Sequence, residues 1–109
     1  MTLRIVHVAS GREWRGGQRQ VWLLARALAK REGVSQVVVT GRHSELAHRL
    51  ASAGIPTVTP TWNGAFSFRA LLATMGAGSR GSVFHAHDSH ALTLSGLATL
   101  ELNDNDAIV

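Results

Sequence analysis

The chain has 109 residues and no cysteine, which fits one small domain and excludes disulfides, thiolate metal sites and cysteine nucleophiles. All eleven Lys and Arg residues lie within residues 1–80 beside three acidic residues, so this part carries +8, whereas residues 81–109 carry four acidic residues and no base. Ten of the bases are Arg, whose forked guanidinium suits phosphate groups, so the composition favours an anionic partner.

The first half of the chain alternates between strand and helix patterns. Apolar, β-branched runs predict strands over Leu3–Val8 and Gln36–Thr40. Apolar residues at i, i+3, i+4 and i+7 predict a helix over Gln18–Arg31, and a second helix is predicted over Ser44–Ala53. Gly54 stands where that second helix should stop.

The second half repeats the alternation. Pro56–Thr59 predicts a short strand near a sheet edge, because its proline cannot donate a hydrogen bond to a neighbouring strand. A helix from Phe68 to Met75, ended by the following glycines, precedes a strand over Ser82–His87 and a helix over Ala91–Leu100. The last residues, 106–109, resemble the start of a fifth strand, so we expect the sequence to stop partway through a larger fold.

This alternation predicts an α/β fold, a Rossmann-like doubly wound parallel sheet of about four strands with helices on both faces. In such sheets, ligands bind beyond the carboxyl ends of the strands. Glycine, Arg, Trp and His residues gather at the predicted strand ends, which indicates a binding cleft. These strand ends are the Gly11–Gly17 loop, Gly41-Arg42-His43, Trp62-Asn63-Gly64 and the segment from His85 to His90.

A glycine pair stands at the entrance to the first predicted helix. Backbone N–H groups of Gly16, Gly17 and Gln18 would lie at the positive end of the helix dipole, where a diphosphate can approach closely. The loop matches neither G-x-G-x-x-G nor the G-K-[ST] ending of a triphosphatase loop, which disfavours both of those nucleotide-binding classes. The alternative is a turn that simply needs glycine.

Histidines at the end of the fourth predicted strand form the second candidate site. His85 and His87 point to the same face because they are two residues apart, and Asp88 follows them. These groups suit hydrogen bonding to a polyhydroxyl or anionic ligand. A metal would need two further ligands and no spacing matches a zinc signature, so no metal is predicted. His7 either reaches the same cleft or belongs to the core.

Aromatic residues at the strand ends complete the candidate cleft. Trp14, beside Arg15, and Trp62 are candidates for stacking on a sugar or a base. Trp22 falls within the first predicted helix and is expected to pack, whereas His48 is expected to be solvated.

Two segments resemble one known family. The run LRIVHVASGREWRGGQRQVWLLARALAKR resembles the opening of glycosyltransferase family 4 enzymes, which begin with a strand, a loop ending in Gly-Gly plus a polar residue, and a helix. The segment VFHAHDSHALTLSGLATL resembles a later strand and helix of that family, with its His-x-His and small-residue helix. The resemblance covers nearly the whole chain and implies the GT-B fold.

The resemblance implies transfer of a sugar, with retention, from a nucleotide-sugar donor to an acceptor, without a bound metal and with no cofactor besides the donor substrate. It places Gly16, Gly17 and Gln18 at the donor diphosphate. In bacteria the acceptor is often a lipid-linked or lipopolysaccharide intermediate. The acceptor-side cleft would comprise Trp14, Arg15, Trp62, His85, His87 and Asp88.

A GT-B enzyme has two Rossmann-like domains, and the second holds most of the donor site. Residues 1–109 would therefore be an incomplete N-terminal domain without its C-terminal partner domain, and inactive alone. A cytoplasmic location is expected, with peripheral contact at an anionic inner-membrane surface as a further option. The alternative is a stand-alone flavodoxin-like module that binds an anion or nucleotide. No nucleic-acid partner is predicted, because the chain has neither a helix-turn-helix nor interleaved aromatic and basic residues.

Overall fold

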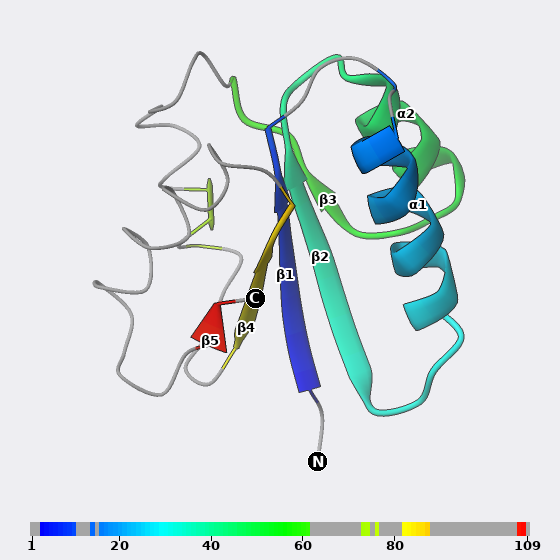
Figure 1. Cartoon of the computed structure of the whole chain (residues 1–109), viewed down its shortest axis with the longest axis vertical. Coiled ribbons are helices and arrows are strands. Elements are labelled where there is room, and N and C mark those ends of the chain that lie inside the picture. The colour runs from blue at the N-terminus through cyan, green and yellow to red at the C-terminus, as the bar shows by residue number, and fades with distance from the viewer. Residues whose placement is uncertain are drawn as a thin grey trace.

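Five parallel strands form one sheet in the computed structural model, which describes residues 3–10, 14, 16–61, 73–74, 76, 82–87 and 107–108 (Figure 1). The spatial order is β3-β2-β1-β4-β5. The strands are β1 (Leu3–Ala9), β2 (Val34–Thr40), β3 (Thr57–Val58), β4 (Val83–Ala86) and β5 (Ala107–Ile108).

The order of the strands creates a point at which the direction of winding reverses. From β1 the chain moves outward to β2 and β3, and then returns to the other side of β1 to form β4 and β5. In open parallel sheets the crevice at such a point, beyond the carboxyl ends of the strands, is where ligands bind. Here the switch point lies between β1 and β4, where His7 of β1 pairs with His85 of β4.

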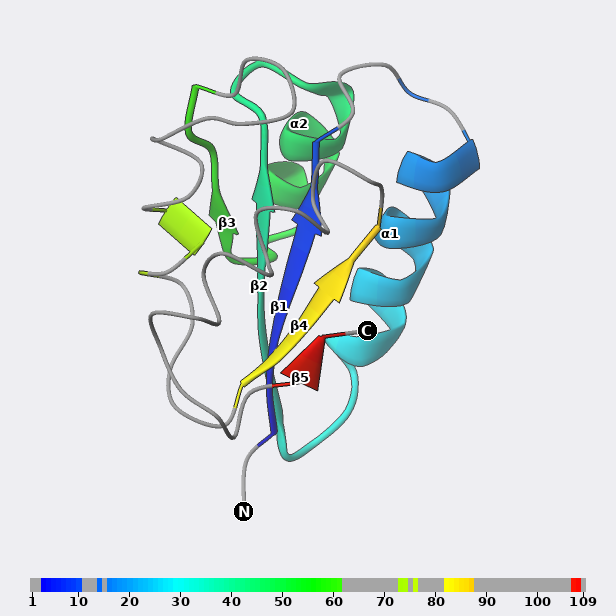
Figure 2. The same cartoon turned by 60° about the vertical axis from the view of Figure 1, so that its left-hand side comes forward.

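Both described helices, α1 (Gly16–Leu28) and α2 (Glu45–Ser52), cover the same face of the sheet, which we call the helix face (Figures 1 and 2). Neither of these helices is long and apolar enough to cross a membrane. Buried side chains from both helices and from β1 and β2 form one core there. Its members are Ala9, Val21, Ala25, Val38, Leu46, Leu50 and Ile55.

A second apolar core lies on the opposite face of the sheet. Alternate residues of three strands supply it, as a period of two along a strand requires, and Ala73 packs against it. Residues 73, 74 and 76 have helical backbone, within and just after the predicted helix Phe68–Met75. The buried core residues on this face are Val6, Val8, Val37, Val39 and Phe84.

The structure confirms the α/β class, the parallel sheet and the short third strand at its edge. It places a strand at Ala107–Ile108, where a fifth strand was expected to start. Gly76 has helical backbone, so helical structure reaches one residue beyond the predicted Met75, and the residues that follow Gly76, where the predicted end falls, lie outside the described residues. Glycine stops a helix when it adopts a positive φ, which Gly76 does not. The predicted helix Ala91–Leu100 lies outside the described residues.

The first helix differs from its predicted bounds at both ends. It begins at Gly16 rather than Gln18, so both glycines belong to its first turn instead of the preceding loop. It ends at Leu28, the last residue of the apolar pattern, rather than at Arg31. Gly33, with φ of 76°, then turns the chain into β2.

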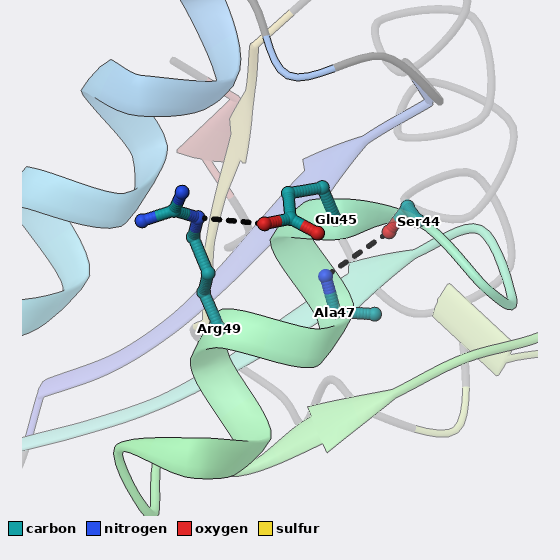
Figure 3. Close-up of polar contacts among 4 residues, drawn as sticks. All are labelled: Ser44, Glu45, Ala47 and Arg49. Atoms are coloured by element: carbon teal, nitrogen blue, oxygen red, sulfur yellow. Dashed lines mark hydrogen bonds and ion pairs between the residues drawn. The ribbon is translucent and has the colours of Figure 1, made fainter.

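The second helix shows how local sequence signals set its bounds. The Ser44 Oγ accepts a hydrogen bond from the Ala47 N–H at 3.0 Å, which caps the N-terminus (Figure 3). One turn later the Arg49 Nε lies 3.1 Å from Glu45 Oε1, an ion pair at i, i+4 (Figure 3). Gly54, with φ of 74°, follows the helix in the left-handed conformation that ends it.

Replacing the cap should destabilise the fold measurably. We expect Ser44→Ala to lower the free energy of unfolding by about 1 kcal/mol, because a buried N–H group of α2 loses its acceptor. Urea denaturation followed by circular dichroism measures this. Ser52→Ala, an exposed change at the end of the same helix, is the matched control and should leave stability within about 0.5 kcal/mol. Equal stability of the two variants would contradict the capping role.

Candidate functional site

Three histidines meet at the switch point between β1 and β4. His7 and His85 are register partners on neighbouring parallel strands, so their side chains project from the same face. His87 follows β4 by one residue, and its N–H donates to the Val8 carbonyl at 3.0 Å, which extends the pairing. We call His7, His85 and His87 the histidine cluster. It combines a buried ring with two half-buried rings.

The three rings occupy one small volume. The centroids of the His85 and His87 rings are 4.0 Å apart, and the His7 ring stacks on His87 at 5.4 Å. The His7 Nδ1 lies 3.2 Å from His87 Nε2, a hydrogen-bond distance. One nitrogen from each ring lies within 4.8 Å of the other two.

A buried glutamine fixes the orientation and tautomer of His7. The Gln36 Nε2 donates to the Ala25 carbonyl of α1 at 2.7 Å, so its Oε1 faces His7 Nε2 at 3.0 Å. Because an amide oxygen only accepts, His7 Nε2 carries the proton and Nδ1 presents its lone pair towards His87. This series of hydrogen bonds, Ala25–Gln36–His7–His87, therefore joins α1 to β2, to β1 and to the residue that follows β4.

Burial favours the neutral form of two of these imidazoles. Desolvation lowers the pKa of His7, the hydrogen bond that His7 donates to Gln36 partly offsets this, and charge on His85 lowers it further. Desolvation also lowers the pKa of His85. At neutral pH His7 and His85 therefore offer uncharged rings, each of which can donate one hydrogen bond and accept another.

The glycine pair lies at the N-terminus of α1. Neither Gly16 nor Gly17 has a positive φ, and a Cβ built on either would meet no heavy atom within 4 Å. A turn that simply needs glycine therefore does not explain the pair. Gln18, the third residue predicted at the diphosphate, has a side chain that is 7 % exposed. Among the residues that the structure describes, none crowds the position that a side chain would take at either glycine.

The tryptophans of the described segments pack against the helix-face core. The Arg49 guanidinium lies 4.2 Å from the centroid of the half-buried Trp14 ring and covers one of its faces. Trp22 packs as predicted, beneath Arg26 at 5.1 Å. The expected solvation of His48 is confirmed. Arg15, Trp62 and Asp88, the remaining predicted acceptor-side residues, lie outside the described residues.

An open hollow of about 850 Å³ lies beside the start of α2. It contains Arg42 and His43 from the end of β2, where sequence reasoning placed part of a binding rim, but none of the histidine cluster. His43 has φ of 66°, a left-handed conformation that is uncommon outside glycine. The other lining residues are Ser44, Glu45, Ala47, His48 and Thr59.

The sequence placed His85 and His87 on one face, left open whether His7 reaches their cleft or belongs to the core, and gave no reason to add Gln36 to the site. Strand register brings these residues together. It sets His7 beside His85 and beside Val38, and Gln36 lies two residues before Val38 on the same face of β2. Comparison of the chain with models of protein families, with curated proteins and with solved structures finds no match. Within the described part of the chain, the geometry shows a cluster of three histidines at a switch point and a helix N-terminus with open space beside its two glycines.

The burial of His7 predicts that the free energy of unfolding depends on pH. A chelator in the buffer keeps trace metal ions from binding the histidines during this measurement. The folded pKa of His7 lies below its ordinary value of 6.5, so the unfolded chain binds more protons as the pH falls below 6.5. The contribution of neutral His7 to the free energy of unfolding is complete above pH 6.5, and it is lost as the pH falls through the pKa of His7 in the folded chain. The slope for this one group is at most about 1.4 kcal/mol per pH unit.

Urea denaturation between pH 7.5 and about pH 5.5, above the range in which ordinary carboxylates titrate, measures this slope. The variant His7→Gln should show a shallower slope than the unsubstituted chain, whatever its absolute stability. His48→Gln, at an exposed position of α2, is the matched control and should keep the original slope. Identical slopes for the unsubstituted chain and His7→Gln would contradict the role of His7.

Proposed function

We propose that this chain is the acceptor-side N-terminal domain of a retaining, nucleotide-sugar-dependent glycosyltransferase of family 4, acting in bacterial glycolipid or lipopolysaccharide biosynthesis. The resemblance of the segments that begin at Leu3 and Val83 supports this proposal. The strand order agrees with it, because β3-β2-β1-β4-β5 is the order of doubly wound sheets that bind nucleotides. The proposal includes a cytoplasmic location.

The observation that carries the proposal is the open space around the glycine pair. A glycine inside a helix costs about 1 kcal/mol relative to alanine, and neither backbone conformation nor packing within the described residues requires it at Gly16 or Gly17. Close approach by a group from outside the chain would explain both glycines. The N–H groups in the first turn of a helix have no acceptor within the helix itself, and the helix dipole also favours an anion there, so a donor diphosphate fits this position.

The histidine cluster supports an acceptor site on the same rim of the sheet. Neutral imidazoles both donate and accept hydrogen bonds, which suits the hydroxyl groups of a sugar. Basic residues dominate residues 1–80, which suits the phosphate of a lipid-linked acceptor. A second Rossmann-like domain would supply the opposite wall of the donor site, so residues 1–109 alone should bind nucleotide weakly and transfer no sugar.

The test is a titration of the ¹⁵N-labelled chain with UDP and with GDP, followed by amide chemical shifts. We expect saturable shifts centred on Gly16, Gly17 and Gln18. Gly17→Val should weaken binding at least tenfold, because its side chain occupies the space that the diphosphate needs. Gly76→Val is the matched control, since Gly76 also has helical backbone and open space around it, and it should bind as the unsubstituted chain does.

A second readout separates loss of binding from loss of fold. Gly17→Ala should raise the free energy of unfolding by about 0.5–1 kcal/mol while it weakens UDP binding, because alanine favours the helix and crowds the ligand. Unchanged affinity in Gly17→Val would contradict the diphosphate role. Binding of FMN without any response to UDP or GDP would favour a stand-alone flavodoxin-like module.

A further inference from the structure

The histidine cluster has the spacing of a metal-binding site. Two imidazole nitrogens bound to one tetrahedral zinc at about 2.0–2.1 Å lie about 3.3 Å apart. The His7 Nδ1 and His87 Nε2 are 3.2 Å apart, and one His85 nitrogen lies within 4.8 Å of both. Rotation of the half-buried His85 side chain would close the remaining gap, while the paired strands hold all three backbones in place.

We propose that His7, His85 and His87 form a three-imidazole binding site for a divalent transition-metal ion of the Zn²⁺ class. The site lies on the helix face at the switch point between β1 and β4. This inference goes beyond the proposed transferase function and does not depend on it.

Gln36, which accepts the hydrogen bond from His7 Nε2–H, is the kind of partner that a metal-bound histidine has. A ligating imidazole nearly always donates its second ring N–H to a carbonyl or carboxylate, which fixes the tautomer and aims the lone pair. Here His7 Nε2–H donates to Gln36 Oε1, and the Ala25 carbonyl holds the Gln36 amide in turn. The ion would take the place of the proton between His7 and His87, and that proton would move to the Nδ1 of His87.

The ligand set determines the class of ion. Three neutral imidazoles suit Zn²⁺, Co²⁺, Ni²⁺ and Cu²⁺, whereas Mg²⁺ and Ca²⁺ prefer oxygen ligands. Three protein ligands leave a fourth tetrahedral position for water or an anionic group such as phosphate.

The experiment is calorimetric titration of the chelator-treated chain with Zn²⁺, together with the absorption spectrum of the Co²⁺ complex. We expect one ion per chain and the intense visible bands of tetrahedral cobalt. His85→Ala and His87→Ala, which change half-buried side chains, should each lower the affinity at least tenfold and abolish those bands. His48→Ala, an exposed change on α2, should alter neither readout.

Gln36→Leu provides a test that leaves all three ligands in place. It removes the acceptor of His7 Nε2–H, so Zn²⁺ affinity should fall about tenfold or more. Absence of binding, octahedral cobalt bands alone, or binding that survives His85→Ala and His87→Ala would overturn the proposal. UDP titrations of the zinc-free chain test the transferase proposal separately, so either proposal can fail while the other stands.

Discussion

The buried hydrogen-bond chain from the Ala25 carbonyl through Gln36 and His7 to His87 is the constraint on which the site depends. It crosses from α1 to β2, β1 and the residue after β4, next to apolar cores on both faces of the sheet. Buried polar groups cost free energy unless each finds its partner, so these side chains permit few arrangements. These hydrogen bonds therefore orient the lone pair of His7 Nδ1 towards the switch point, where it could bind either an acceptor hydroxyl or a metal ion.

Most of the fold could be predicted from the sequence because its signals are local. Apolar, β-branched runs mark β1 and β2, and Ser44 and Gly54 mark the two ends of α2. Glycine was the less reliable signal, since it stops a helix or continues one according to its φ. Gly54 stops α2 and Gly76 has helical backbone, whereas Gly16 starts a helix where a loop was expected.

The candidate site could be predicted only in part, for a physical reason. The two-residue period of a strand places His85 and His87 together, and the sequence shows this directly. His7 joins them from 80 residues away and Gln36 contacts His7 from 29 residues away, through strand register. Register is set by the packing of both sheet faces, so no local pattern reveals it. The open space that the described residues leave beside the glycine pair likewise depends on the fold, so no local pattern reveals it.

One measurement tests the central claim most directly: the ¹⁵N chemical shifts of the His7 ring in the zinc-free chain at pH 7.5. The structure assigns the proton to Nε2, held by Gln36, and the lone pair to Nδ1. We therefore predict a protonated-type shift for Nε2 and an unprotonated-type shift for Nδ1, with the pattern altered in Gln36→Leu. A proton on Nδ1, or a fully protonated His7 ring, would contradict the buried chain and the site built on it.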